Sequence, residues 1–425
     1  MKLLIYTIIL IITGSSVYSQ INDINCFKNI RSLYGDYKFE TGASFNSYLS
    51  SNSVNNSLLY ALFGNQYIDD AVKNRNHLKP VNLAGNEDNL NFYFCHIPDS
   101  LFRTSNIGYR IGFTNHNHRD MKFSDDLFNL VFYGNKQFAG DTADMSDFQI
   151  NFMTYQELQF GIFKKHTIES GSLVYYVGFS FLKGQDYNSV RFRNANLFTA
   201  ETGEYIDLNV SASYQFIDTV KSSFGDFNGL GTALNFYLDY EDTDNLYNIN
   251  LSINNVGFIR WKNNAHTINL DTAIHFDGIE IQNIFEYDDS SYFGIDPDSI
   301  VTDFFQRTDT ASFTKVLPER IHLSITKKML DQRLLTTLGL GYYYGTNMKL
   351  PLFYAQGEYL INDNFSVSIL TGYGEYSGFH LGGGLKLKCY KEKIYANMFS
   401  NNVLGFILLN NAFSQNIYAG FSYRF

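Results

Sequence analysis

Apolar and polar residues alternate with a period of two along most of the chain, which indicates β-strands with two different faces. In YIDLNVSASYQF, every second position from Ile206 to Phe216 is apolar or aromatic, and the positions between them are Asp, Asn, Ser and Gln. The stretches LYNINLSINN (246–255), ERIHLSITKK (319–328) and FSVSILTGY (365–373) show the same pattern. Similar runs begin near eight further positions: Gly108, Phe148, Ser172, Leu230, Leu334, Phe353, Phe379 and Ile394.

The spacing of these runs predicts antiparallel strands of membrane-spanning length. From about residue 318 onward, the runs are separated only by short turns such as INDN and YKEK, so neighbouring strands must form hairpins. Each run has about ten residues, enough for a tilted strand to cross a bilayer. Aromatic residues lie near the ends of the apolar faces, at Tyr205, Tyr214, Phe216, Tyr342 and Tyr344, where the interfacial girdles of a transmembrane barrel would lie.

One or two large soluble β-domains would also alternate, with the apolar face inward. The polar faces here are rich in Asn, Ser, Gly and Gln rather than Lys and Glu, as a crowded hydrated lumen requires. We therefore expect an all-β fold: a transmembrane antiparallel up-and-down β-barrel of about 14 strands, with 12 or 16 as alternatives, plus short plug or loop helices. The sequence contains no run of 18 or more apolar residues, so it predicts no membrane-spanning helix.

The last ten residues, NIYAGFSYRF, form an alternating strand that we expect to close against the first strand. An unpaired edge in lipid would cost several kcal/mol for each backbone group. A final strand with alternate aromatics and a terminal Phe resembles the assembly signal of bacterial outer-membrane barrels. The matching positions are Phe421, Tyr423 and Phe425, and the resemblance implies that the barrel-assembly machinery is a partner during biogenesis.

The N-terminus predicts export. Lys2, an apolar run from Leu3 to about Thr13, and small residues at Val17 and Ser19 have the order of a secretory signal. We expect cleavage between Ser19 and Gln20, so that residues 1–19 are removed and 20–425 form the barrel domain in the outer membrane. Cys26 lies too far past the apolar run to be a lipid attachment site.

Three stretches break the alternation and predict helices. The first, from Ser57 to Val72, has Ser57 as the N-cap candidate and could plug or gate a lumen. The second begins after the cap Ser124 and stops at Gly134. The third, DSIVTDFFQR, lies in a long irregular insert at 262–317, which we expect on the periplasmic side, the side of the C-terminus.

Composition narrows the function classes further. Aromatic residues are 17% of the chain, with 39 Phe and 32 Tyr, and only 5 Pro interrupt possible strands. The net charge of −10 argues against a nucleic-acid surface. Three scattered cysteines predict neither a disulfide framework nor a metal site, and we expect no cofactor.

Candidate chemistry is sparse. HNHRD places His116, His118 and Asp120 on one side of an extended strand end, although a polar loop explains them better than a metal site. DYEDTDN (239–245) clusters carboxylates at a hairpin end, where a solvated turn is the simpler interpretation. His322 and Ser324 are two apart on a strand, about 6.5 Å, too far for a direct nucleophile–base bond.

We interpret the charged residues of the polar faces as a lumen network without catalytic residues. Such a network fills the interior and links the barrel walls. Its predicted members are Arg110, Asp207, Asp239, Arg320, His322, Glu358, Lys386 and Lys388.

Several segments together resemble a known family. They are FYGNKQFAG (132–140), YQELQFGIFKK (155–165), VGFSFLKGQDYNSVRF (177–192), INNVGFIRWKNNA (253–265) and ASFTKVLPERIHLSI (311–325). They resemble a poorly characterised family of Bacteroidota outer-membrane barrels, a domain of unknown function, over roughly residues 35 to 425. The family is distantly akin to PorP/SprF-type barrels of type IX secretion and gliding, and to fatty-acid-transporter-like barrels.

Three functions follow as hypotheses. The resemblance favours a structural or secretion-associated barrel with a periplasmic or secretion-system protein partner and no catalytic role. The alternative is a gated channel or carrier for a small ligand, with hydrophobic ligands included. An outer-membrane enzyme ranks last, because no nucleophile–base pair is evident.

Overall fold

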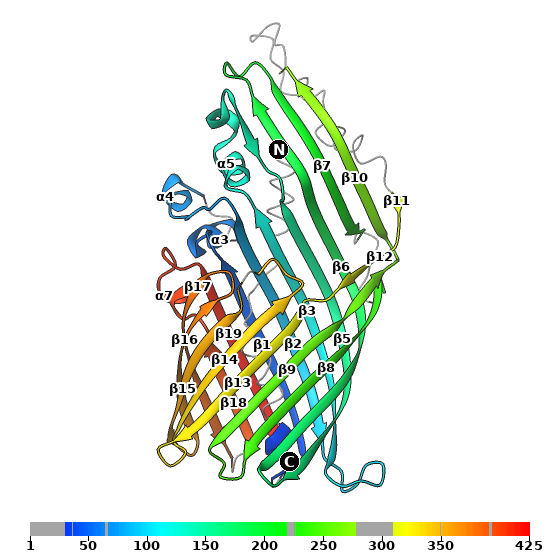
Figure 1. Ribbon diagram of the computed structural model, residues 1–425, viewed down its shortest axis with the longest axis vertical. Coiled ribbons are helices and arrows are strands. Elements are labelled where there is room, and N and C mark those ends of the chain that lie inside the picture. The colour runs from blue at the N-terminus through cyan, green and yellow to red at the C-terminus, as the bar shows by residue number, and fades with distance from the viewer. Residues whose placement is uncertain are drawn as a thin grey trace.

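The fold is a closed antiparallel β-barrel with a tall extension on one side (Figure 1). The computed structural model describes residues 30–35, 37–63, 67–218, 225, 227–277, 309–348, 350–390 and 393–425. The predicted signal peptide, its cleavage site and the helix expected in DSIVTDFFQR lie outside these residues.

Fourteen strands close the ring, which confirms the predicted fold and strand number. The ring is closed by β1 and β19, which pair from Glu40↔Arg424 to Ser50↔Ser414. Around the barrel the strands are β1 (Phe39–Ser51), β2 (Asn82–His96), β3 (Ile107–Phe123), β5 (Gln149–Ile168), β6 (Gly171–Thr199), β8 (Gly229–Asp242), β9 (Tyr247–Trp261), β13 (Glu319–Met329), β14 (Leu334–Tyr344), β15 (Leu352–Asn362), β16 (Phe365–Gly374), β17 (Gly378–Cys389), β18 (Ile394–Ser400) and β19 (Ser414–Arg424).

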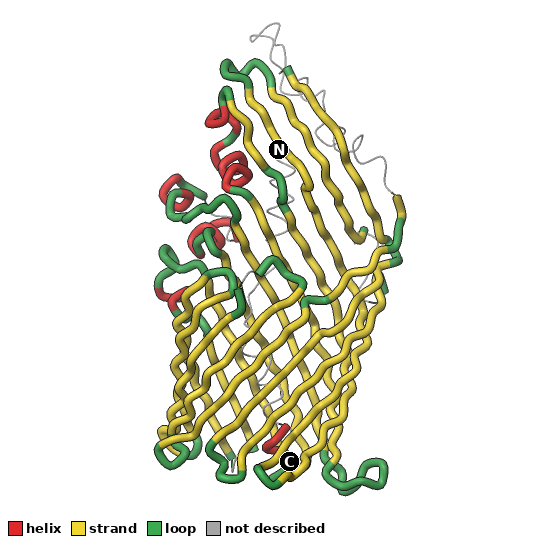
Figure 2. Tube along the Cα trace, viewed as in Figure 1, coloured by secondary structure: helices red, strands yellow, loops and turns green. Residues whose placement is uncertain are grey.

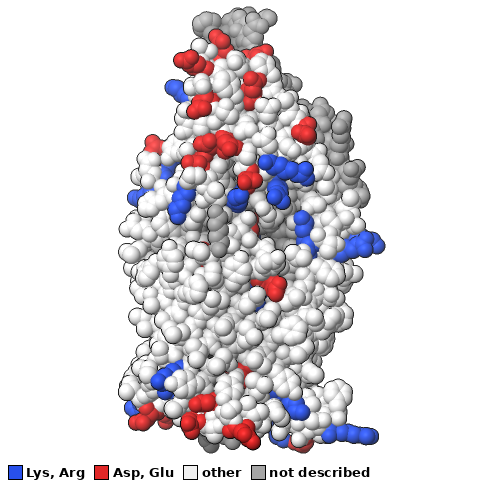
Figure 3. Space-filling view, viewed as in Figure 1, with Lys and Arg blue, Asp and Glu red and all other residues white. Residues whose placement is uncertain are grey.

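The two faces of the wall follow the alternation in the sequence. On β5, Leu158, Phe160 and Ile162 are exposed outward, whereas Glu157 and Gln159 are buried in the interior. Figure 3 shows the result on one side of the molecule: a broad, nearly uncharged band lies between two charged ends. An apolar belt outside and polar residues inside is the pattern of an outer-membrane-type barrel.

The extension arises because β6 has 29 residues, far more than its neighbours in the barrel need. Its first half pairs with β8, and its second half pairs with β7 (Ile206–Ile217), which in turn pairs with β10 (Ala265–Phe276). Three short strands complete this region: β4 (Asp141–Asp144), β11 (Asp309–Thr310) and β12 (Phe313–Val316).

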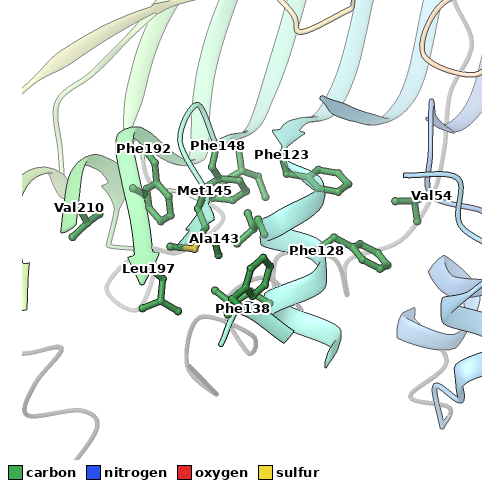
Figure 4. Packing of buried hydrophobic residues seen from close by; sticks show 14 of the residues in the cluster. Val54, Phe123, Phe128, Phe138, Ala143, Met145, Phe148, Phe192, Leu197 and Val210 are labelled. Atoms are coloured by element: carbon green, nitrogen blue, oxygen red, sulfur yellow. The ribbon is translucent and has the colours of Figure 1, made fainter. Parts of the chain in front are cut away.

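The strand predicted at 206–216 is therefore confirmed, but its predicted place in the barrel wall is wrong. Its apolar face packs against α5 (Asp125–Tyr133) and the surrounding buried residues (Figure 4), where Val210 lies in one cluster with Phe128 and Phe192. Tyr214 and Phe216 stack on each other with centroids 4.5 Å apart, above the barrel rather than in an interfacial girdle. An alternation of period two indicates that one face of a strand is apolar and covered. It does not distinguish lipid from a helix as the cover.

The helices are short and mostly gather at one rim (Figure 2). Ser124 caps α5, accepting a hydrogen bond from the Leu127 N–H, and Gly134 ends it at φ 81°, as predicted. In α3 (Asn56–Phe63) the cap is Asn55 instead of the predicted Ser57, because the Asn55 side chain accepts from the Ser57 N–H at 2.7 Å. Further short helices in the described part of the chain are α4 (Asp70–Lys73), the 3₁₀ turn η1 (Asn135–Phe138) and α7 (Leu404–Ile407). None of the helices in the described part of the chain is long and apolar enough to cross a membrane.

The insert at 262–317 differs from its prediction in two ways. It contains β10, β11 and β12, so it is not irregular throughout. It also leaves the barrel at the end opposite Phe425 (Figure 1), since seven strands, β13 to β19, follow it and an odd number reverses the side. If the C-terminus faces the periplasm, the insert faces the outside.

The two ends of the barrel are unequal. Short turns such as 169–170 and 363–364 lie at the end that carries Phe425. Longer connections, including 52–81 and 124–148, lie at the opposite rim. Short periplasmic turns and long outer loops are the rule for outer-membrane barrels. We call the Phe425 end the inner end and the opposite rim the outer end.

Candidate functional site: the closed polar lumen

A buried carboxylate, Glu157 on β5, organises the middle of the lumen. It accepts hydrogen bonds from the Ser180 hydroxyl at 2.5 Å and the Asn235 amide at 3.3 Å. Nε2 of His116 lies 2.8 Å from its second oxygen, and the imidazole stacks on Tyr155 with centroids 4.4 Å apart. These residues come from β3, β5, β6 and β8, so the cluster ties four strands together.

The cluster contains a histidine, an acid and a serine, but not in the order that hydrolysis needs. The Ser180 hydroxyl donates to Glu157, while His116 contacts the other oxygen of the same carboxylate. A nucleophilic serine must instead donate to a base that a third residue orients. The arrangement therefore fills and links the walls and does not activate Ser180.

Two arginines occupy the same level. Arg110 is 1% exposed, donates to Gln159 at 3.3 Å and lies 4.4 Å from the Tyr93 ring centroid. Arg320 is ion-paired with Glu87 and lies over the Tyr343 ring. A buried charge is costly unless neighbouring groups compensate it, and these contacts supply part of that compensation.

The cavity at this level is small. Its volume is about 60 Å³, and its lining includes Arg110, His116, Glu157 and Arg320. That volume holds about four water molecules. The cavity is therefore a small polar compartment in the middle of the lumen.

The inner end is closed by residues 30–34, a turn of helix and its continuation inside the barrel. Arg31 is ion-paired with Asp239, approaches Glu241 at 3.2 Å and donates to the Ser172 hydroxyl at 2.6 Å. Ile30 and Leu33 are 1% and 2% exposed and pack in one cluster with four aromatic residues of the wall: Tyr93, Phe163, Tyr176 and Tyr237. We call residues 30–34 the inner plug.

The outer end carries a second buried polar group. Asp120 accepts hydrogen bonds from the Tyr376 hydroxyl at 2.6 Å and from the Asn347 amide at 2.6 Å. Glu375 and His380 are both fully buried, with their closest atoms 3.7 Å apart. Buried polar side chains thus contact one another inside the barrel at its inner end, its middle and its outer end.

Glu375, in the turn between β16 and β17, gives a prediction of pH dependence. Burial raises its pKa to about 7, partly opposed by the Tyr48 hydroxyl. The folded state then holds the proton more tightly than the unfolded chain, so stability is full below about pH 4.5 and falls as pH rises to about 7. Unfolding by urea in detergent micelles should show this loss, and Glu375→Gln should remove it. Equal pH profiles for the two proteins would contradict the prediction.

Seven of the eight predicted lumen residues lie inside the barrel, at different levels. Arg110, Asp239 and Arg320 take the positions described above, and Nε2 of His322 lies 2.9 Å from the Tyr354 hydroxyl. Glu358, Lys386 and Lys388 line a cavity of about 220 Å³ between β15, β16 and β17, with Lys386 donating to Glu358 at 3.3 Å.

Asp207 is the exception, and its predicted place in the lumen is wrong. It lies on β7 in the extension, where it pairs with His275 of β10. The alternation of β7 is as clear as that of a barrel strand, so the sequence pattern could not distinguish the two positions.

The histidine-rich motif HNHRD and the acidic motif DYEDTDN also have defined positions in the structure. His116, His118 and Asp120 lie within β3 and face the interior, not an exposed loop as predicted. His118 approaches Glu87 at 3.8 Å, so the three motif residues contact different partners. Among the described residues, no group of three or more His, Cys, Asp or Glu could hold a metal ion. In DYEDTDN, Asp242 stabilises the turn by accepting from the Leu246 and Tyr247 N–H groups, both at 2.8 Å.

Sequence reasoning missed Glu157, Arg31, Glu40 and Glu87. For Glu157 the information was present, since Glu157 and Gln159 alternate with exposed apolar residues in YQELQF. Arg31 carries no such pattern because it precedes the first strand.

The closing strand places the three predicted assembly residues on the outside of the barrel. Phe421 and Phe425 are about half exposed, whereas Ser422 and Arg424 between them are buried. Phe425 exchanges two backbone hydrogen bonds of 3.2 Å with Phe39, and the two rings stack at 5.1 Å. The last residue is thus paired to the first strand.

Deleting Phe425 is expected to slow assembly and lower the folded fraction, because it removes both backbone bonds at the seam and the ring stack. The measurement is the fraction of protein with heat-modifiable mobility in SDS gels after expression. Phe379→Ala, which removes an equally exposed ring from the outer face of β17, serves as the control. A folded fraction equal to that of the control would contradict the prediction.

Solved structures with some similarity are outer-membrane barrels. The P. putida toluene transporter TodX has 8% identity and a TM-score of 0.44, with 92% of this chain and 90% of that chain covered. A deletion mutant of TodX, a monoaromatic hydrocarbon channel, has 9% identity and a TM-score of 0.46, with 92% and 91% covered. The translocator domain of the autotransporter NalP from Neisseria meningitidis has 7% identity and a TM-score of 0.35, with 97% and 100% covered. At these values the similarity says nothing about what this chain binds.

The sequence itself matches one protein family. Among curated proteins, none matches it significantly. The model of the family of unknown function DUF5723 matches residues 35–398, most of the chain and nearly the whole barrel. The predicted membership of a family of unknown function is thereby confirmed, and the chain belongs to the DUF5723 family.

Proposed function

We propose that the protein is an outer-membrane barrel that conducts small polar solutes through a lumen closed at rest by the inner plug. The closure by Arg31, Ile30 and Leu33 carries this proposal. The plug is part of the N-terminal segment and enters the barrel before β1, so it can leave without breaking any strand pairing. The polar lining of the middle cavity suits polar solutes better than hydrophobic ones.

A permeability assay tests the proposal. Proteoliposomes containing the full mature chain should take up little sugar or amino acid, whereas a variant lacking residues 20–35 should take them up. Heat-modifiable mobility in SDS gels would verify that both proteins are folded in the vesicles. If neither protein admits solutes, the conduit function is wrong; if both admit them equally, the plug is not the closing element.

A second candidate function is docking of a protein partner at the outer end. The extension of β6, β7 and β10 supports it, because it rises beyond the barrel wall and is braced by the α5 cluster. The resemblance to secretion-associated barrels, stated as an expectation above, would imply such a partner. Capture of a surface protein by the full chain, lost on deletion of residues 200–216 together with 265–276, would favour docking over conduction.

We propose no catalytic function. The observation that supports this is the Glu157 cluster, in which Ser180 donates to the carboxylate rather than to a base.

A further inference from the structure

An apolar groove of about 850 Å³ lies on the outer face of the barrel, where β6 exchanges its partner β8 for β7. Phe181, Leu230 and Phe258 line it and are 56%, 61% and 47% exposed. Ile259, the neighbour of Phe258 on β9, is buried on the opposite, inner side of the wall. The groove is therefore open to the surroundings of the barrel and not to the lumen.

Glycine makes the exchange of partners possible. A Cβ atom at Gly184 would lie 2.6 Å from the Trp261 ring, and one at Gly229 would lie 2.7 Å from Ile259. These two glycines are the last pair of the β6–β8 ladder, so the fully buried indole can lie against the wall at that point. The segment with Phe227 and Asn228 then stands along the outer surface and borders the groove.

Three cations lie at this groove. Lys183, Arg260 and Lys262 are among its sixteen lining residues. None of these sixteen residues is Asp or Glu. On β9, the outward positions change from Val256 and Phe258 to Arg260 and then Lys262. The groove thus spans the border between the apolar belt and the charged surface. Figure 3 shows such a border on one face of the molecule.

Hydrogen bonds hold the border of the groove in place. The Asn228 side chain donates to the Gln185 carbonyl at 2.7 Å, and the Asn263 side chain donates to the Phe227 carbonyl at 2.8 Å. The Lys262 N–H donates to the Asn228 carbonyl at 2.9 Å. The Lys183 ammonium lies 4.9 Å from the Phe227 ring centroid. The groove is therefore preformed, which lowers the entropic cost of binding.

We propose that this groove binds a membrane lipid whose phosphate-bearing headgroup has a net negative charge. The acyl chain lies along Phe181, Leu230 and Phe258, and the phosphate lies among the three cations. Burial of apolar surface stabilises the chain, and Lys and Arg bind phosphate by charge-assisted hydrogen bonds. The groove lies toward the outer end, so the lipid comes from the leaflet away from Phe425. This inference rests on the proposed membrane location and not on conduction.

The test compares retention of phosphatidylglycerol and phosphatidylcholine by the full mature chain in micelles, measured by native mass spectrometry. The combined variant Lys183→Gln, Arg260→Gln and Lys262→Gln should retain phosphatidylglycerol about tenfold more weakly than the unmodified chain. The matched control makes the same charge change at distant exposed sites, Arg103→Gln, Lys136→Gln and Lys327→Gln, and should retain it normally. Heat-modifiable mobility verifies that each variant is folded.

A second variant tests the apolar part without changing charge. Thr232 lines the groove, opposite Phe258 in the β8–β9 ladder, and Thr232→Trp fills the space beside it. It should weaken retention of phosphatidylglycerol by a similar factor. Equal retention by the unmodified chain and the triple variant, or equal retention of both lipids by the unmodified chain, would overturn the proposal. Failure of the chain to insert into vesicles would instead refute the membrane location.

Discussion

Replacing Arg424 by Ala is expected to lower the free energy of unfolding by about 3–5 kcal/mol, the usual cost of leaving a buried charge without its partner. Arg424 Nε lies 2.6 Å from a Glu40 carboxylate oxygen, and both side chains are at most 5% exposed. The guanidinium also lies 3.9 Å from the Tyr395 ring centroid. Urea unfolding in micelles measures the effect.

The reason for so large an effect is the position of the pair on the seam between β1 and β19. In the described part of the chain, the remaining Glu40 keeps the hydrogen bond that the Tyr93 hydroxyl donates to it at 2.6 Å. Combining Arg424→Ala with Glu40→Ala should therefore cost less than the sum of the two single changes. Arg103→Ala, at an exposed turn, is the control. A loss below about 1 kcal/mol for Arg424→Ala would show that the pair lies in a hydrated environment.

Replacing Glu157 by Ala should be the second most damaging change, with a loss of about 3 kcal/mol or more in the same unfolding measurement. The substitution removes the acceptor for Ser180 and Asn235 and the partner of His116, all of them buried. It also leaves a cavity beside the existing one, which adds to the cost.

Two variants separate the hydrogen bonds from the volume. Glu157→Gln keeps the volume and one acceptor oxygen, so it should cost clearly less than Glu157→Ala. Glu169→Ala removes a carboxylate from an exposed turn and should leave stability unchanged. Similar losses for Gln and Ala at position 157 would mean that the negative charge itself, rather than the acceptor, holds the cluster together.

Much of the barrel could be predicted from local sequence because each strand faces two different environments. Arg320 and His322 alternate with the apolar residues Ile321 and Leu323, so their inward direction could be predicted. Partners across the lumen could not be predicted, since Arg31 and Asp239 are 208 residues apart and meet only once the ring has closed. Strand register and closure are properties of the whole sheet, and no short window of sequence contains them.

The extension shows where the alternation itself misleads. Ile206, Leu208 and Val210 would serve equally well against lipid or against α5, and in the structure they pack on the α5 side. The strand β2 was not predicted, for the opposite reason. Its segment NLAGNEDN has polar residues on both faces near the outer end, so the sequence shows no alternation there. Alternation identifies a one-sided strand but not the material that covers it.

The most direct test of the closed lumen is single-channel recording in planar bilayers. We predict that the full mature chain shows no steady conductance, because the inner plug closes the inner end of the lumen. The variant Arg31→Ala with Leu33→Asp, which removes the ion pair and the apolar contact of the inner plug, should show discrete openings. Lys38→Ala, which removes only the exposed pair with Asp99, should stay silent. A steady conductance of the unmodified chain would contradict the account.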